Sequence, residues 1–258
     1  MIPPRVIPCL LLKNDGLVKT VKFKEPRYIG DPINAIRIFN EKEVDELVFL
    51  DITASQERRS PPFAMLDQIA TECFMPLCYG GGVRTVEHMR QLFAIGLEKV
   101  AVNSFAVERP GFMREAADLF GSSSVIASID VRKSWRGKYE VVTYGGRKKT
   151  GLSPVEFAVE MERQGAGEIL LNSVDRDGTM SGYDIPLIRM VTDAVGVPVV
   201  ACGGAGSVAD LAEAITAGGA SAAAAGSLFV YHGPHRAVLI TYPERSELKP
   251  VFTVGKTN

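Results

Sequence analysis

The sequence predicts an α/β fold, a closed (βα)8 barrel of the TIM type built from two homologous half-barrels. Residues 5–107 recur at an offset of about 120, which is the signature of a repeated structural unit. Short apolar runs alternate with helix-like stretches, as they do around a parallel sheet. The length of 258 residues fits one such barrel. We therefore expect a single domain over residues 1–258, with half-barrels at about 1–122 and 123–258.

The repeat aligns corresponding elements of the two halves. Residues 6–11 align with 125–130, residues 46–49 with 168–171, and Gly81-Gly82 with Gly203-Gly204. Because the offset is nearly constant through separate elements, chance similarity of apolar runs is a poor explanation. Two matching sets of four strands could form an open doubly wound sheet, but the repeat symmetry favours closure.

Eight β-branched or apolar runs are expected to be the strands. They cover residues 5–12, 46–52, 75–79, 98–103, 124–130, 168–172, 198–201 and 221–225. Helix-like segments lie between them, and several begin with capping pairs such as Asp31-Pro32 and Ser153-Pro154. These segments cover residues 31–41, 60–71, 85–94, 108–119, 153–165, 184–194 and 207–217. The eighth helix is doubtful, because Gly233-Pro234 interrupts it and residues 233–243 read as extended.

Long loops are expected after strands 1, 5 and 6, at residues 13–31, 131–150 and 173–183. In a closed barrel they lie at the carboxyl ends of the strands, where ligands bind. Residues 132–149 read as a basic hairpin, which could attract an anionic ligand but is also typical of a solvated loop. Its basic residues are Arg132, Lys133, Arg136, Lys138, Arg147, Lys148 and Lys149.

Composition excludes several classes of partner and cofactor. A formal charge of −1 makes nucleic acid and acidic membranes unexpected partners. No apolar stretch is long enough to span a bilayer and no secretory signal is present, so a cytoplasmic protein is expected. Cys9, Cys73, Cys78 and Cys202 lack paired spacing and read as reduced core thiols. His88, His232 and His235 have no ligand spacing, so neither a metal nor a cofactor is expected.

Two glycine-rich turns could each hold a phosphate. Gly80-Gly81-Gly82 follows strand 3 and Gly203-Gly204 follows strand 7, and each leads into a helix. Glycines allow backbone N–H groups to approach an anion, although such turns often only relieve crowding. Small donors end strands 4 and 8, namely Asn103, Ser104, Gly226 and Ser227. Together the two turns favour a long ligand with a phosphate at each end.

Several motifs closely resemble the HisF family, the cyclase subunit of imidazole glycerol phosphate synthase in histidine biosynthesis. They are LVFLDITAS at 47–55, GGG at 80–82, GAGEILL at 165–171, DRDGT at 175–179 and SGYD at 181–184. The resemblance runs from about residue 5 to 230. It implies a barrel that takes ammonia from a HisH-like glutaminase subunit docked at the amino-terminal face. At the opposite face, the ammonia would meet a substrate with two phosphates.

The resemblance also implies two catalytic aspartates, at the ends of strands 1 and 5. Asp130 matches the second, but Leu11 occupies the position of the first. A positioned acid or base contributes about 10²–10⁴ in rate, so this loss bears directly on catalysis. Asn172 stands where the family usually has Thr, and Gly145 where it usually has Ser. Whether the chain is itself an enzyme therefore stays open.

Other family positions are retained. Arg5, Glu46, Lys99 and Glu168 match the charged ring that gates ammonia entry in the family, although each alone could be a solvated residue at a strand start. Lys19 matches a lysine that contacts substrate phosphate, or it is a mobile surface residue. Asp177 and Gly178 belong to the expected substrate site, and Asp51 and Asp177 could equally be structural caps.

Three functions follow as hypotheses. In its altered tail and Leu11 the chain resembles HisF paralogues that are found with surface-polysaccharide genes. Those paralogues occur together with a HisH-like glutaminase and an N-acetyl sugar amidotransferase. On that reading the chain conducts ammonia for sugar amidation. The alternatives are an authentic cyclase that recruits another carboxylate, such as Asp177 or Asp51, and a silent activator of the glutaminase.

Overall fold

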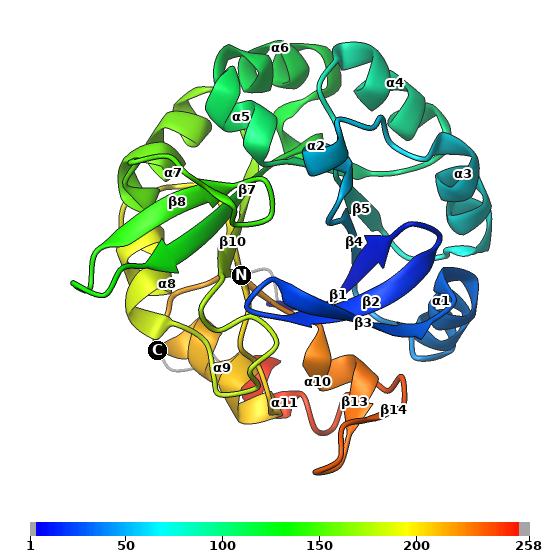
Figure 1. Cartoon of the computed structure of the whole chain (residues 1–258). Coiled ribbons are helices and arrows are strands. Elements are labelled where there is room, and N and C mark those ends of the chain that lie inside the picture. Colours follow the sequence, from blue (N-terminus) through cyan, green and yellow to red (C-terminus); the bar gives the residue numbers. More distant parts are fainter. Residues whose placement is uncertain (1–3, 253–258) are drawn as a thin grey trace.

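The computed structural model describes residues 4–252. Within that range eight parallel strands close into a barrel, and helices form a ring outside it (Figure 1). The barrel strands, each paired with the next and the last with the first, are β1 (Arg5–Lys13), β4 (Leu47–Asp51), β5 (Leu77–Gly80), β6 (Lys99–Val102), β7 (Val125–Lys133), β10 (Glu168–Ser173), β11 (Val199–Cys202) and β12 (Ala222–Ala225). Pairing of Arg5 with Ala222 is part of the closing contact. The predicted closed barrel is confirmed.

The ring contains long helices after most strands. These are α1 (Pro32–Glu41), α3 (Phe63–Glu72), α4 (Val86–Ala94), α6 (Gly111–Phe120), α7 (Pro154–Arg163), α8 (Ile185–Thr192) and α9 (Val208–Thr216). Polar caps begin several of them: the Asp31 carboxylate accepts from Asn34 N at 3.0 Å, and Ser207 and Asp210 form a capping box at α9. All seven predicted helical segments are therefore present.

Short helices lie between the long ones. They are α2 (Ala54–Glu57), α5 (Ser104–Glu108), α10 (Ser227–Val230), α11 (Lys249–Phe252) and the 3-10 turn η1 (Ser122–Ser124). Sequence periodicity missed them because one turn of helix carries too little pattern to recognise.

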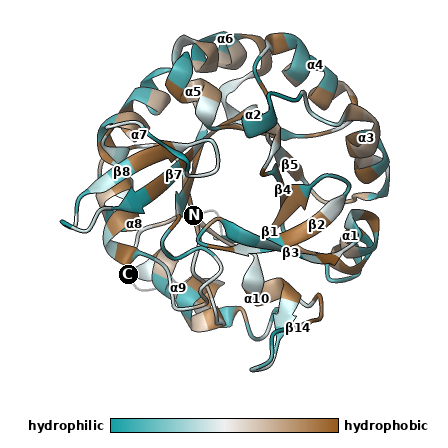
Figure 2. Ribbon diagram, viewed as in Figure 1, coloured by the Kyte–Doolittle hydropathy of each residue, from teal (hydrophilic) through white to brown (hydrophobic). Residues whose placement is uncertain are grey.

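Two apolar layers hold the barrel together. The larger lies between strands and helices and includes the fully buried Phe39, Phe49 and Phe112. The smaller fills the barrel interior. Figure 2 shows hydrophobic residues concentrated on the barrel strands, with hydrophilic residues on the outer helices and loops. The core is thus continuous around the whole ring.

Two hairpins extend the sheet at the carboxyl ends of the strands. Residues 13–31 are not the open loop that the sequence predicted: β2 (Gly16–Val21) and β3 (Lys24–Gly30) form an antiparallel hairpin that continues β1. β2 is buried at four consecutive positions, Leu17 to Thr20, so it lacks the period of two by which a sequence reveals a half-buried strand. The predicted basic hairpin is present as the end of β7, β8 (Tyr139–Thr143) and β9 (Lys148–Lys149).

The tail has no long amphipathic helix among the described residues. A small hairpin of β13 (Tyr231–His232) and β14 (Ala237–Val238) is followed by irregular chain, as the extended pattern predicted. The Tyr242 hydroxyl donates to Val6 O at 3.0 Å, so the tail runs back to the start of β1. The short α11 packs against α9. No helix within residues 4–252 has the length and apolarity to cross a membrane.

Candidate functional site

The period of two along each strand sorts the barrel interior into levels. On β1 the inward side carries Arg5, Ile7, Cys9 and Leu11 in succession from the amino end. On β10 it carries Glu168, Leu170 and Asn172. From the amino end upward, these two strands therefore contribute residues to a charged floor, an apolar middle and the upper chamber.

The floor is a ring of four charges, and we call it the charged ring. Arg5 donates to both Glu46 and Glu168, and the Lys99 amino group lies 2.9 Å from a carboxylate oxygen of each. The carboxylates are buried, at 3% and 6% exposure for Glu46 and Glu168. Each cation thus touches both anions. The structure brings together all four residues that the sequence singled out.

Electrostatics couple the members of the charged ring tightly. Burial alone would lower the pKa of Lys99, but the carboxylates of Glu168 and Glu46 outweigh it and raise the pKa. The pKa of Arg5 is raised for the same reason. Both cations therefore stay charged at neutral pH, and the ring carries two positive and two negative charges that balance inside the barrel end.

Above the charged ring the interior is apolar. Its inward side chains include Ile7, Val48, Cys78, Ala101, Ile126, Leu170, Val200, Ala222 and Ala224, all buried. The alanines of β12 are small, and they line one side of this layer. The free-energy cost of desolvation in this layer is very large for an ion and much smaller for a small neutral molecule.

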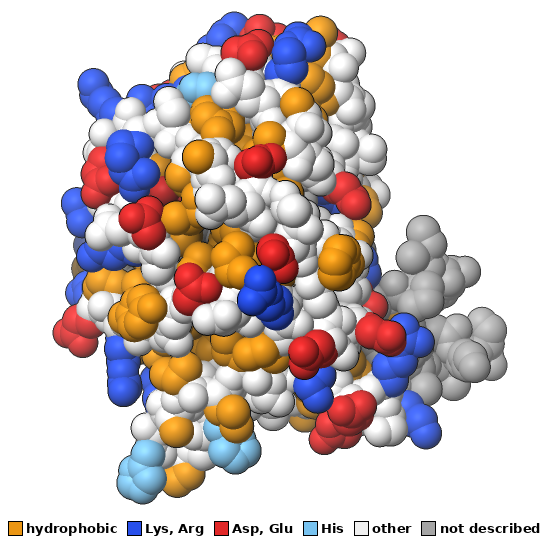
Figure 3. All heavy atoms as spheres, turned by 90° about the vertical axis from the view of Figure 1, so that its right-hand side faces the viewer, with side chains coloured by type: hydrophobic (Ala, Val, Ile, Leu, Met, Phe, Trp, Pro, Cys, Tyr) orange, Lys and Arg blue, Asp and Glu red, His pale blue; other side chains and the backbone are white. Residues whose placement is uncertain are grey.

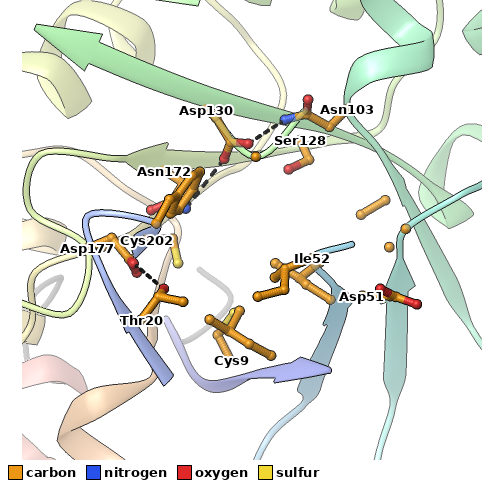
Figure 4. Close-up of a pocket in the computed structure, with 18 of the residues that line it drawn as sticks. Cys9, Thr20, Asp51, Ile52, Asn103, Ser128, Asp130, Asn172, Asp177 and Cys202 are labelled. Atoms are coloured by element: carbon orange, nitrogen blue, oxygen red, sulfur yellow. Dashed lines mark hydrogen bonds between the residues drawn. The ribbon is translucent and has the colours of Figure 1, made fainter. Parts of the chain in front are cut away.

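The upper chamber is a pocket at the carboxyl ends of the strands (Figure 4). Every residue predicted to bind substrate or phosphate lines it, as do Leu11 and Asp130. The predicted set is Lys19, Gly81, Gly82, Asn103, Ser104, Asn172, Asp177, Gly178, Gly203, Gly204, Gly226 and Ser227. The doubled half-barrel thus brings both glycine-rich turns to one cavity.

Asp130 is held by two side-chain amides. Asn103 Nδ2 donates to it at 3.0 Å, and Asn172 Nδ2 approaches it at 3.4 Å (Figure 4). Burial raises the pKa of Asp130 to about 7, although the bonds from Asn172 and Asn103 oppose the rise. A carboxyl group with this pKa can both accept and release a proton near neutral pH. Asn172 Oδ1 has no hydrogen-bond partner among the described residues.

Asp51 does not replace the carboxylate that is missing at Leu11. Leu11 is 8% exposed and packs in the apolar interior layer. Asp51 is occupied as a cap, because its Oδ1 accepts from Ala54 N at 2.9 Å and from Thr53 N at 3.0 Å. Its other oxygen lies 3.3 Å from Arg59. Asp51 is therefore a structural cap, and it also lines the pocket.

Asp177 lies on the pocket wall beside the β2–β3 hairpin. Its carboxylate accepts from Thr20 Oγ1 at 3.1 Å (Figure 4). Burial raises the pKa of Asp177, and the nearby Lys19 charge opposes that rise. Lys22 N also donates to Asp177 O at 2.9 Å. Asp177 therefore holds the β2–β3 hairpin against the pocket through two hydrogen bonds.

Lys19 is buried inside the pocket and is not a mobile surface residue. It is 6% exposed, and its Nζ donates to Cys9 O at 2.8 Å. A Cβ placed on Gly226 would lie only 1.7 Å from that Nζ. Glycine at 226 therefore makes room for the ammonium group beside the second glycine-rich turn.

Near the first glycine-rich turn, several polar groups already have partners within the protein. Ser104 Oγ accepts from Tyr144 N at 3.0 Å, and the Asn103 amide is turned to Asp130. Gly81 has φ +132°, and a Cβ there would lie 2.7 Å from Asp51 O, so close packing alone requires this glycine. The two ends of the pocket are thus unequal: the Lys19 ammonium lies beside Gly226, and protein contacts occupy part of the first glycine-rich turn.

The pocket also contains residues that the sequence did not single out, among them Thr20, Phe23, Ser128 and Gln56. Thr20 and Phe23 reach the pocket because residues 13–31 form a hairpin, and Ser128 follows from the alternation of β7. Gln56 enters from α2 and packs against Gly145, where a Cβ would lie 2.3 Å from Gln56 Nε2. All four cysteines are free thiols, as expected for core residues.

The raised pKa of Asp130 makes a testable difference to stability. Between the unfolded value near 4 and the folded value of about 7, the folded protein holds the extra proton, so stability falls as pH rises through this range. Asp130→Asn has no titrating group at this position, so its stability lacks this decrease with pH. Its melting temperature relative to wild type is expected to climb from pH 4 to pH 7 and level off above. Differential scanning calorimetry would measure it, and a pH-independent difference would contradict the shifted pKa.

Comparison with known proteins agrees with this geometry. A protein of Pseudomonas aeruginosa named "Putative imidazole glycerol phosphate synthase subunit hisF2" is 55% identical over 248 residues, covering 96% of this chain and 99% of its own length. A Leptospira interrogans protein named "Putative imidazole glycerol phosphate synthase subunit HisF" is 47% identical, covering 98% and 100%. The "Imidazole glycerol phosphate synthase subunit HisF" of Alkaliphilus metalliredigens is 47% identical, covering 90% and 92%.

Family membership follows from the same comparison. The profile described as "Histidine biosynthesis protein" matches residues 5–235, which include the barrel strands, the charged ring and the pocket. The chain belongs to this histidine biosynthesis protein family and, within it, to the HisF-type subunits.

Proposed function

We propose that this HisF-type chain conducts ammonia and does not carry out the cyclisation itself. It receives ammonia at the charged ring from a HisH-like glutaminase, passes it through the apolar layer, and releases it at the pocket. The ammonia serves to amidate an N-acetyl sugar for a surface polysaccharide such as the O-antigen. The relatives' names describe subunits of imidazole glycerol phosphate synthase, so an assembly with a second subunit is part of the proposal.

The observation that carries the proposal is the contrast between the two ends of the barrel. At the floor, Arg5, Glu46, Lys99 and Glu168 are all present and mutually paired. At the top, Asp130 faces a chamber whose other catalytic position holds Leu11. A leucine cannot exchange a proton, so chemistry that needs two carboxylates has lost one of them.

The apolar middle layer supports passage of the neutral molecule. Ammonia carries no charge and loses little when it leaves water, whereas ammonium would pay the desolvation cost of an unpaired ion. Between the charged ring and Asp130, the inward residues such as Ile126 and Leu170 offer no carboxylate to hold a cation. The interior therefore favours ammonia over ammonium.

The amino-terminal face offers a surface for the glutaminase. Phe74 lies in the connection that leads into β5, and Leu119 lies in the last turn of α6, before β7; they are 87% and 56% exposed. A groove next to Leu119 is lined by Phe93, Phe120 and Lys99, so it reaches the charged ring. Exposed apolar side chains beside a buried ionic site are typical of a protein interface.

Reconstitution tests the proposal. The chain, a HisH-like glutaminase and an N-acetyl sugar amidotransferase from the same organism are mixed with glutamine and the sugar substrate. We expect amidated sugar, with less free ammonia released than the glutaminase produces without the acceptor enzyme. If the chain alone converts the histidine-pathway bisphosphate with added ammonium at rates normal for cyclases, the proposal is wrong.

One observation favours an authentic cyclase as a second candidate. Asp177 lines the pocket and burial raises its pKa, so it could exchange a proton in place of the missing acid. Its bonds to Thr20 and the hairpin would first have to open. Failure to complement a strain that lacks its own cyclase would exclude this candidate. If the partner's glutamine hydrolysis rises but ammonia always escapes to solvent, the chain is only an activator.

Phe74 provides a test of the docking face. Phe74→Ala is expected to weaken glutaminase binding by about 10-fold or more, because exposed aromatic anchors dominate interfaces. Its exposure of 87% means that folding is little affected. Isothermal titration with the glutaminase measures the change, and Val159→Ala, on the outer ring at 42% exposure, is the control. Equal affinities for both variants would place the interface elsewhere.

A further inference from the structure

We propose that the basic hairpin, residues 132–149, is the docking surface for the enzyme that consumes the ammonia, and that this partner presents an acidic face to it. The inference rests on the proposed function and adds the site of the acceptor enzyme to it. It is carried by the charge, the aromatic side chains and the position of the hairpin.

The hairpin concentrates unpaired positive charge. It holds seven Arg and Lys residues and one acid, Glu140, in a chain whose formal charge is −1. Glu140 accepts from Gly151 N at 2.9 Å. Within residues 4–252 none of the seven cations forms an ion pair with a carboxylate. Six of the seven are exposed, and only Arg132 is partly buried.

Cations elsewhere on the surface are often balanced locally. Arg37 lies 3.2 Å from Glu72, Arg90 lies 3.4 Å from Glu87, and Arg189 lies 3.0 Å from Asp193. Figure 3 shows basic and acidic side chains interspersed on the side of the molecule that it presents. The hairpin holds seven cations and one acid, so its field favours a negatively charged partner.

Aromatic side chains alternate with these cations. Trp135, the single Trp of the sequence, is 87% exposed at the turn between β7 and β8. The Arg136 guanidinium stacks 4.6 Å from the Trp135 ring centroid, and Lys133 Nζ lies 5.0 Å from that of Tyr139. Trp, Tyr and Arg are the residues that contribute most to protein interfaces. A hairpin that only needed solubility would have no use for an exposed tryptophan.

The hairpin connects the pocket with the outside. At its inner turn, Gly145 lines the pocket, and Tyr144 N is fixed to Ser104 Oγ at 3.0 Å. Arg132 Nη1 donates to Gly146 O at 2.9 Å, which closes this end. The opposite turn projects beyond the ring of helices (Figure 1). A protein seated along the hairpin would cover the rim of the pocket.

Covering the rim matters because of the chemistry of ammonia. Ammonia that escapes into water at neutral pH takes up a proton, and the resulting ammonium has no lone pair with which to attack. The acceptor enzyme must therefore bind over the pocket, so that ammonia reaches it without entering bulk water. An acidic protein face drawn to this hairpin satisfies the requirement, and a freely diffusing small anion does not.

The test compares two nitrogen sources in the reconstituted mixture of chain, glutaminase and N-acetyl sugar amidotransferase. Trp135→Ala and the double variant Arg136→Glu/Lys138→Glu are each expected to lower glutamine-dependent amidation at least about 10-fold. Amidation with added ammonium chloride is expected to stay unchanged, because it bypasses the transfer. Met190→Ala and Arg189→Glu, exposed changes on the outer helix α8, are the matched controls and are expected to behave as wild type.

The outcomes separate the two proposals. If the unmodified mixture uses glutamine and the hairpin variants do so equally well, the docking surface is wrong and the proposed function stands. If the unmodified mixture amidates the sugar only with ammonium chloride, the proposed function itself fails. Binding of a 20-nucleotide RNA or DNA is measured with the same variants. If these variants abolish nucleic-acid binding but leave amidation intact, the partner is a nucleic acid and the inference is overturned.

Discussion

Replacing Leu11 with aspartate is expected to raise turnover of the histidine-pathway bisphosphate substrate, with ammonium as nitrogen source, by about 100-fold or more. Leu11 lines the same pocket as Asp130, and both stand at the upper level of their strands. A carboxyl group placed there would restore the acid–base pair that the family resemblance implies. Single-turnover and steady-state kinetics on the purified variant measure the gain.

The surroundings of Leu11 define the control. Its neighbours in the interior layer, such as Cys9 and Val18, are apolar, so a carboxyl group there is desolvated and its pKa rises. Both Leu11→Asp and Leu11→Asn are expected to lower the free energy of unfolding by a similar 2–4 kcal/mol, roughly the range for a polar group in an apolar site. Only the aspartate should gain activity. If neither variant gains any, the additional barriers are Asn172, Gly145 or the tail.

The barrel and the position of the two glycine-rich turns could be predicted because both follow from local pattern. The internal repeat placed both turns on one face, and the starts of the strands placed Arg5 and Glu168 at the other. These inferences need only the order of the elements and the direction of the chain. The grouping of the four ring residues, and the inclusion of Lys19 and Asp177 in the pocket, came from the resemblance to the HisF family. In the structure the ring residues meet and the predicted pocket residues share one cavity.

The remaining features depend on contacts between segments distant in sequence. Lys19 reaches the backbone of Cys9 because the β2–β3 hairpin folds inward, and Asp177 holds it there through Thr20. Tyr242 joins the tail to Val6, more than two hundred residues away. The sequence gives the type of residue at each of these positions, but it does not show which distant backbone group the residue contacts. The contacts of Asp51 are local by contrast, with Thr53 N and Ala54 N, and a structural cap was one of the alternatives that the sequence left open.

The charged ring is expected to show the largest effect on stability. Glu46→Ala leaves Arg5 and Lys99 sharing the single carboxylate of Glu168 in a buried site. Removal of one partner from a buried ion pair typically costs about 3–5 kcal/mol, because the remaining charge is desolvated without compensation. Chemical denaturation with urea would measure the loss as a lower midpoint with little change in slope.

Two further variants show whether the cost comes from charge balance or from packing. Glu72→Ala removes the carboxylate of an exposed pair with Arg37 and is expected to change stability by less than about 1 kcal/mol. Glu46→Ala combined with Lys99→Met removes one charge of each sign, so it should recover part of the loss. If the double variant is as unstable as the sum of its single changes, the four residues do not act as a neutral unit. In that case the four charges would not cancel, and a net charge would remain at the floor of the barrel. The floor would then not favour neutral ammonia over ammonium.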